Sequence, residues 1–234
     1  TKITNGVFAP WAIMKDDYWK VGGHDKLFAP QSKEDSDIFN RFHLSGYEFV
    51  QTWRGLVYHM TSRGSRFNPM AGGAPGKDSP EWIHTTTKNM RNFIRKWGSV
   101  VLHDEEMKPI VKPKYDIGLV VRNIDENLLR MIEPWCDTIY VDCSKSIIKK
   151  YIDEEQPNTT MNLSERIQTM KSPRNNDVVV EFDSRKLNSD NFKYIMMFPD
   201  ILQDSGEVGE LKLDIFKFEI HSLKTYEKDL ICQI

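Results

Sequence analysis

The chain has 234 residues and a formal net charge of −2, with a sequence pI of about 6.3. This near-neutral balance argues against nucleic acid or an acidic membrane surface as the main partner, and no apolar run approaches the roughly 20 residues that a membrane-spanning helix needs. Three cysteines are too few for a disulfide framework and predict reduced thiols in a cytoplasmic protein. The length predicts one large or two small domains. Because the chain starts without Met and shows no signal peptide, we expect a fragment or a processed chain.

The first part of the chain alternates between short apolar segments and turn signals. Residues 7–9 are typical of a short buried strand, and residues 16–21 predict one or two helical turns. The apolar spacing of residues 34–45 predicts a helix, and residues 47–59 alternate well enough for one or two strands. These strands end at His59, and a histidine at such a place is more often a hydrogen-bonding residue than a metal ligand.

Three acidic residues, Glu34, Asp35 and Asp37, lie in the first turn of the helix predicted over 34–45. One interpretation is compensation of the helix dipole, which contributes about 0.3–1 kcal/mol for each acid. The other is a functional one, in which Asp35 acts as a general base. The residue pattern by itself leaves both interpretations open.

The middle of the chain contains a loop, a helix and a linker. Residues 61–79 are rich in Gly, Pro, Ser and Asn, a composition that buries too little apolar surface to order itself and that suits a flexible linker. Ser79, Pro80 and an acid predict a helix start, and the helix is expected to run to residue 97. The prolines of residues 108–114 predict an extended linker and a domain boundary near residue 112.

The second half has the pattern of an α/β domain. Continuous apolar strands that alternate with helices predict a parallel βαβ unit, and the fold class is α/β with a mixed sheet and helices. The strands are expected over residues 116–121, 138–142, 178–183 and 210–222, and the helices over 126–133, 146–154 and 191–198.

The first half contains, in this order, Gly22-Gly23-His24-Asp25-Lys26, then Glu34-Asp35-Ser36-Asp37, then His59, Asn89 and Lys96-Trp97-Gly98. This arrangement resembles the acceptor-side half of a family 2 glycosyltransferase with the GT-A fold. The family pattern there is a GG(F/Y)DE-type segment, an ED-x-D helix and a strand that ends in His. His24 stands where the family has an aromatic residue. The nucleotide-binding half of the family, which normally comes first, does not precede this segment.

The resemblance implies a role for each matched residue. Asp35 would deprotonate the acceptor hydroxyl, and Glu34 and Asp37 would orient the acceptor or the Asp35 carboxylate. Gly22, Gly23 and Asp25 match the residues that form the bottom of the sugar-binding site in the family.

The resemblance also implies a metal and a lid. The family's histidine often completes a site for a divalent cation (Mn²⁺ or Mg²⁺) that holds the donor diphosphate, and His59 matches it. As an alternative to a linker, residues 61–79 would form a lid over the nucleotide sugar, with Arg63 or Arg66 meeting the diphosphate.

The second half resembles, more weakly, the nucleotide-binding half of the same fold. Its strands lead to Val121-Arg122-Asn123, Val141-Asp142-Cys143-Ser144 and Phe182-Asp183-Ser184-Arg185, and the last stands where the family has a metal-binding D-x-D. Arg185 replaces the second acid, and arginine does not ligate a cation. Because ligands bind at the carboxyl ends of strands in open α/β sheets, Asn123, Asp142 and Asp183 are expected to share one edge and to contact the donor. The alternative is an unrelated α/β domain with Asn and Asp in its turns.

The sequence thus predicts two parts, residues 1–112 as the acceptor-side half and residues 113–234 as a nucleotide-binding-like or accessory α/β domain. They form either a permuted GT-A fold or a truncated catalytic domain with an accessory domain. The resemblance implies a metal-dependent, inverting glycosyltransferase whose partners are a nucleotide-sugar donor and a glycan or other hydroxyl acceptor. The alternative is a non-catalytic glycan-binding or scaffolding fragment of a larger glycosyltransferase.

Overall fold

The computed structural model describes residues 10–50, 52, 54–55 and 65–231, which fall into two compact units. Unit 1 takes the described part of Thr1–Arg91 together with Val101–Val111 and the C-terminal residues from Asp229. Unit 2 takes Asn92–Val100 and Lys112–Lys228. Among the described residues, no helix is both long enough and apolar enough to cross a membrane.

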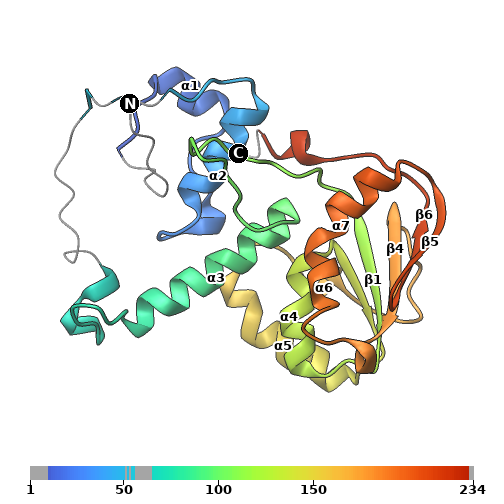
Figure 1. Cartoon of the computed structure of the whole chain (residues 1–234). Helices are drawn as coiled ribbons and strands as arrows, with labels where there is room; N and C mark the ends of the chain where they lie inside the picture. Colours follow the sequence, from blue (N-terminus) through green and yellow to red (C-terminus); the bar gives the residue numbers. More distant parts are fainter. Residues whose placement is uncertain (1–9, 51, 53, 56–64, 232–234) are drawn as a thin grey trace. The chain divides into compact units, whose positions relative to one another are not determined.

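Unit 1 is built from helices and loops. It contains α1 (Lys15–Lys20), α2 (Glu34–Leu44) and the first part of α3 (Pro80–Trp97), as Figure 1 shows. The spacing of apolar residues along α2 places Ile38, Phe39 and Phe42 on its buried side, where they pack with Val21. Trp11, Ile13, Tyr18, Tyr47 and Phe49 cover this cluster.

The loop before α2 is tied to α3 by side-chain hydrogen bonds. The amide nitrogen of Asn89 donates to the carbonyl oxygens of Phe28 and Gln31, each at 2.7 Å. The Nζ of Lys88 donates to the carbonyl oxygen of Ala29 at 2.8 Å. These contacts fix the chain just ahead of the acidic first turn of α2.

The strands expected in the first half are not found where the structure describes it. Residues 47–50 have no strand structure. The side chains of Tyr47 and Phe49 pack on the α2 cluster, Val50 is exposed, and the described residues include no segment that pairs with them as a strand. Most of the remainder of the expected strand, and the strand expected over 7–9, lie outside the described residues. The described part of unit 1 therefore holds no strand beyond isolated bridges.

Unit 2 contains a mixed six-stranded sheet, which confirms the α/β fold class. Its strand order is β3-β2-β1-β4-β6-β5, with β1 to β4 parallel and β6 antiparallel to both neighbours. The strands are β1 (Ile117–Arg122), β2 (Thr138–Val141), β3 (Ile167–Thr169), β4 (Val178–Asp183), β5 (Gly209–Leu213) and β6 (Phe216–Ile220). The helices are the end of α3, then α4 (Glu126–Ile132), α5 (Lys145–Glu155), α6 (Leu163–Arg166) and α7 (Phe192–Ser205).

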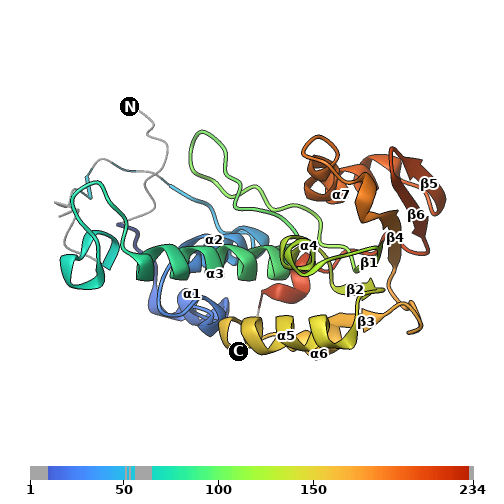
Figure 2. The same cartoon turned by 90° about the horizontal axis from the view of Figure 1, so that it is seen from below.

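The strand register shows which face of the sheet the helices cover. One apolar row crosses all six strands and consists of Ile167, Ile139, Leu119, Val180, Phe218 and Leu211. Phe198 of α7 packs on this row, with its ring 5.1 Å from that of Phe218, and α5 borders a cavity with Ile167 at the other end. Helices α5 and α7 therefore lie along the same face of the sheet, which the ribbons in Figures 1 and 2 also show.

The opposite face carries a smaller cluster formed by Val120, Tyr140 and Val179, against which Met170 packs. The phenol of Tyr140 donates to the Oδ1 atom of Asn176 at 2.9 Å. A Cβ atom at Gly118 would lie only 2.3 Å from that Oδ1 atom. Glycine is required in β1 because the Asn176 side chain lies directly over the strand.

A buried ion network lies under the helices of unit 2. Arg95 of α3 bonds Glu133 at 2.7 Å and Glu155 at 2.7 Å, and all three side chains are at most 5% exposed. Arg166 bonds Glu133 from a second direction at 2.8 Å. Burial alone would raise the pKa of Glu133, but the two guanidinium groups outweigh burial and lower it to about 2.

Two expectations for the C-terminal part were incomplete. The residues expected as one strand over 210–222 form the hairpin β5–β6, which turns at Asp214 with a positive φ of 50°. Helix α7 continues six residues beyond Pro199, where the sequence predicted a stop at residue 198. The buried side of α7, which includes Phe198, Pro199 and Leu202, stabilises the helix across the proline.

Candidate functional site

The Gly22–Gly23 turn ends α1 and presents His24. Both glycines have positive φ angles, 89° and 64°, which other residues adopt only with strain. A Cβ atom at Gly23 would also lie 3.0 Å from the rings of Tyr18 and Trp19. The predicted pair of glycines is thus needed for the turn itself.

A buried ion pair anchors this turn to α2. The guanidinium of Arg41 bonds Oδ2 of Asp37 at 2.7 and 3.0 Å, and it donates to the carbonyl oxygens of Val21 and Gly23, the latter at 2.6 Å. The Asp37 side chain is fully buried. The structure therefore corrects the prediction for Asp37, because a carboxylate enclosed with Arg41 is not available to orient an acceptor.

We expect Asp37→Ala to lower the free energy of unfolding of unit 1 by about 3 kcal/mol, because it leaves the buried Arg41 without its carboxylate. The measurement is urea unfolding combined with hydrogen exchange of the α2 amides. Asp35→Ala in the same helix is the control, and it should cost less than about 1 kcal/mol, since its carboxylate is 36% exposed. Equal effects of the two variants would contradict the structural role of Asp37.

The residues just before α2 have an unusual backbone. Ser32 and Lys33 both have positive φ angles, 80° and 76°, although neither is glycine. Such residues persist only where the surrounding structure holds them, and they are common at functional sites. Here they set the direction in which α2 begins, and hence where Glu34 and Asp35 lie.

Glu34 and Asp35 have different environments despite being neighbours. Burial raises the pKa of Glu34, and the negative charge of Asp35 raises it further. Asp35 is 36% exposed and lies between an indole and an imidazole. Two adjacent carboxyl groups in unlike surroundings are typical of sites that move protons.

Asp35 makes its contacts through one carboxylate oxygen. The indole Nε1 of Trp11 donates to Oδ1 of Asp35 at 3.3 Å, and Nε2 of His24 lies 3.8 Å from the same oxygen. The other ring nitrogen of His24, Nδ1, is 2.9 Å from the hydroxyl of Tyr18. His24 therefore lies between Tyr18, which it contacts at hydrogen-bond distance, and Asp35, whose Oδ1 is within ion-pair distance but beyond hydrogen-bond length.

The other residues predicted for the first half have varied surroundings. Asp25 caps the short helix after the turn, where its Oδ1 accepts from the amide of Leu27 at 2.9 Å. Arg66 is paired with Asp78 at 2.7 Å and is 54% exposed, and its proposed contact with a diphosphate stays a prediction. Arg63 and His59 lie outside the described residues.

The residues predicted at the edge of the second-half sheet do lie together. The backbone amide of Asn123 donates to Asp142 at 2.7 Å, and the Asn123 side chain donates to Asp183 at 3.1 Å. β1 and β4 are neighbours: the chain passes from β1 through β2 to β3 on one side of β1 and then crosses to β4 on its other side. Asn123 and Asp183 therefore follow the two strands of the topological switch point, where open α/β sheets bind ligands.

This edge does not fit a divalent metal by itself. Arg185 bonds both oxygens of Asp183, with Nη2 at 2.6 Å from Oδ2, and these hydrogen bonds hold the pKa of Asp183 well below its usual range. Asp142 already accepts two backbone amides. Across the described residues, no group of three His, Cys, Asp or Glu side chains is arranged to hold a metal ion.

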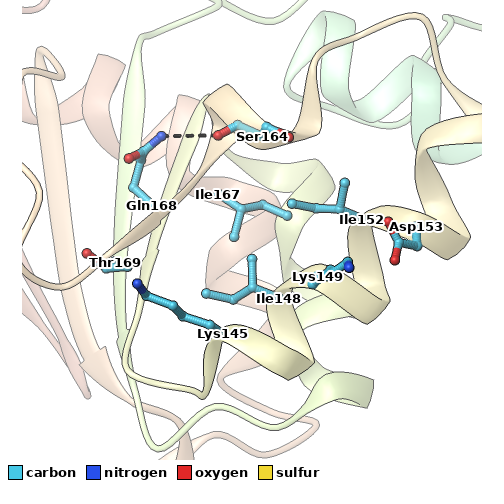
Figure 3. A pocket seen from close by; sticks show the side chains of 9 residues that line it. All are labelled: Lys145, Ile148, Lys149, Ile152, Asp153, Ser164, Ile167, Gln168 and Thr169. Carbon is cyan, nitrogen blue, oxygen red and sulfur yellow. Dashed lines mark hydrogen bonds between the residues drawn. The ribbon is translucent and has the colours of Figure 1, made fainter.

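A separate cavity of about 350 Å³ opens in unit 2 between α5 and the α6–β3 segment. Figure 3 shows the side chains of Ile148, Ile152 and Ile167 meeting in it, with Lys145 and Lys149 from α5 at its border. No residue that the sequence singled out lines this cavity. The cavity and the polar edge at Asn123 are thus distinct features of unit 2.

Comparison with protein-family models, with curated proteins and with solved structures finds no match to this chain. The sequence did not place Trp11 or Tyr18 beside Asp35. His24 was the residue that could have pointed to them, because it stands where the resembled pattern has an aromatic residue. In the structure His24 contacts both Tyr18 and Trp11.

Proposed function

We propose that the chain is a glycosyltransferase that transfers a sugar from a nucleotide-sugar donor to a glycan or other hydroxyl acceptor, with inversion at the anomeric carbon. The observation that carries the proposal is the half-exposed Asp35 carboxylate, held at the start of α2 between Trp11 and His24. A positioned carboxylate of this kind suits the deprotonation of a hydroxyl nucleophile. The resemblance of residues 22–37 to the acceptor side of family 2 enzymes supports the same role.

The donor side of the proposal concerns the edge of the sheet in unit 2. Asn123, Asp142 and Asp183 converge at the carboxyl ends of β1, β2 and β4, and the resemblance gives these positions to the nucleotide. Glu34, whose pKa is raised by burial, would contact the acceptor as a hydrogen-bonding group. A divalent cation stays part of the proposal only through His59, and no step here depends on it.

A non-catalytic glycan-binding or scaffolding fragment is the second candidate function. The observation that favours it is the ion pair between Arg185 and Asp183, which occupies the carboxylate that the resembled pattern uses for metal. Under this function the acceptor side would bind a glycan, and the sheet edge of unit 2 would bind no donor.

A thermal-shift titration with UDP and GDP, each with and without Mn²⁺, separates the two candidates. We expect one nucleotide to stabilise the protein, since a ligand at about 100 times its dissociation constant adds roughly 2.7 kcal/mol. Asp183→Asn should weaken the shift, whereas Asp190→Asn, at an exposed position in the same unit, should not. A nucleotide shift that needs Mn²⁺, and that disappears in His59→Ala, would establish the metal.

The absence of any shift with both nucleotides would contradict the proposed transferase, because it would leave the chain without a donor site. It would favour the glycan-binding fragment instead.

A further inference from the structure

The two oxygens of the Asp35 carboxylate have different surroundings. We propose that His24 and Trp11 hold Oδ1 of Asp35 and thereby leave Oδ2 to take the acceptor proton, so that His24 is a positioning residue of the reaction. This inference rests on the proposed function. It adds a role for His24, which stands where the resembled family has an aromatic residue.

Both contacts that reach the Asp35 carboxylate end on the same oxygen. Nε1 of Trp11 is 3.3 Å from Oδ1, and Nε2 of His24 is 3.8 Å from it. Among the described residues, the Asp35 side chain forms no other hydrogen bond or ion pair. Oδ2 therefore keeps both of its lone pairs for a substrate.

The indole that holds Oδ1 is itself fixed by packing. The Trp11 ring lies edge-on to the rings of Phe39 and Phe42, with centroids 5.6 and 6.4 Å away. Both phenylalanines belong to the buried side of α2, the helix that also carries Asp35. The N–H group and its acceptor are thus attached to one packed element, which keeps their separation constant.

The Tyr18 hydroxyl contacts Nδ1 of His24, the ring nitrogen other than the one that lies nearest Asp35. The Tyr18 hydroxyl oxygen accepts the backbone amide of His24 at 2.9 Å, and the same hydroxyl is 2.9 Å from Nδ1. When the hydroxyl proton is donated to Nδ1, the proton of the neutral imidazole is on Nε2. The N–H group on Nε2 then points towards Oδ1 of Asp35, as the N–H group of Trp11 does.

The chemical step follows from this arrangement. The acceptor O–H bond breaks, its proton moves to Oδ2 of Asp35, and the freed oxygen lone pair forms the new bond to the anomeric carbon. The bond from that carbon to the donor diphosphate breaks, and its electron pair leaves with the diphosphate. His24 and Trp11 exchange no proton in this step, and they keep the carboxylate in the orientation that places Oδ2 towards the acceptor.

The charged and titratable groups that face His24 belong to two helices. Tyr18 comes from α1, and Glu34 and Asp35 come from the first turn of α2. Burial raises the pKa of Glu34. The carboxylate that His24 contacts in the structure is that of Asp35.

Two substitutions at His24 separate positioning from simple packing. His24→Phe keeps an aromatic ring, which is the residue type of the resembled pattern, but removes the N–H group. His24→Gln keeps an N–H donor at about the position of Nε2. We expect His24→Phe to lower kcat about tenfold with KM unchanged, and His24→Gln to recover most of the loss.

A second readout does not depend on transferase activity. In a ¹⁵N–¹H spectrum of the full chain, the indole N–H resonance of Trp11 should move in Asp35→Asn, because this substitution changes the side chain that accepts its hydrogen bond. Full kcat in His24→Phe, or an unmoved indole resonance in Asp35→Asn, would overturn the inference. An inactive wild-type chain with the expected resonance shifts would overturn the proposed function and the catalytic role, but it would leave the anchoring of Oδ1 established.

Discussion

If the chain is the proposed transferase, Asp35→Asn is expected to lower kcat for sugar transfer by at least about 100-fold, because it removes the carboxylate proposed to take the acceptor proton. The amide keeps the size and shape of the side chain, so the fold of unit 1 should be unchanged. Donor binding should also be unchanged, since the donor is assigned to the edge of the sheet that carries Asn123 and Asp183. Single-turnover transfer with a panel of nucleotide sugars, measured alongside nucleotide binding, checks both expectations.

Asp16→Asn is the matched control for this variant. Asp16 is an acid in the first turn of α1, in the same unit, and its side chain is exposed. Its substitution should change kcat by less than about twofold. Loss of activity in both variants would indicate that a change of surface charge, and not the base, causes the effect of Asp35→Asn.

Glu133→Gln is expected to destabilise unit 2 by about 4–5 kcal/mol, the upper part of the range for breaking a buried ion pair. The substitution leaves two guanidinium groups, those of Arg95 and Arg166, without the carboxylate between them. Glu155 remains beside Arg95, which keeps one partial partner in place. Chemical denaturation followed by hydrogen exchange of the β1 and β2 amides measures the loss.

The surface pair between Lys150 and Glu126 provides the control for the buried network. Its atoms are 2.9 Å apart, but the side chain of Lys150 is 58% exposed. Lys150→Gln should therefore cost less than about 1 kcal/mol. An equal loss of unfolding free energy in Glu133→Gln and Lys150→Gln would show that burial does not strengthen the Glu133 network.

The Glu133 carboxylate should also make the stability of unit 2 depend on pH. The folded-state pKa of Glu133 is lowered from 4.5 to about 2, so the unfolded chain binds more protons than the folded chain between these values. The stability that Glu133 contributes is fully present above pH 4.5 and is lost as the pH falls through about 2. Glu133→Gln should remove this part of the acid dependence, which denaturation curves across this pH range measure.

The parallel core of unit 2 could be predicted because its strands are buried on both sides. The apolar runs ending at Val121 and Val141 are too short for helices and are bounded by turn residues, and they became β1 and β2. β3 was missed because three residues give no periodic pattern, and its pairing with β2 depends on tertiary contacts. The extent of α7 was underestimated because local propensity stops a helix at Pro199, whereas packing against β6 continues it.

The candidate site was predictable where backbone topology alone determines it. Parallel strands bring their carboxyl ends to one edge, so Asn123 and Asp183 could be placed together from sequence. The contact of His24 with Asp35 could not be predicted, because it depends on the positive φ angles of the intervening loop and on the fixed position of α2. The burial of Asp37 could not be predicted, because acids in the first turn of a helix are also found in solvent, and the sequence does not show that Arg41, one helical turn away, encloses this carboxylate.

The two edges of the sheet in unit 2 bear on how the protein behaves at high concentration. An unpaired strand edge is a template on which a second molecule can add a strand, and this is a common route to aggregation. β3 offers only three residues for such pairing, and β5 carries Glu210 and Lys212 on its exposed side. Short length at one edge and charge at the other should keep this sheet from extending between molecules.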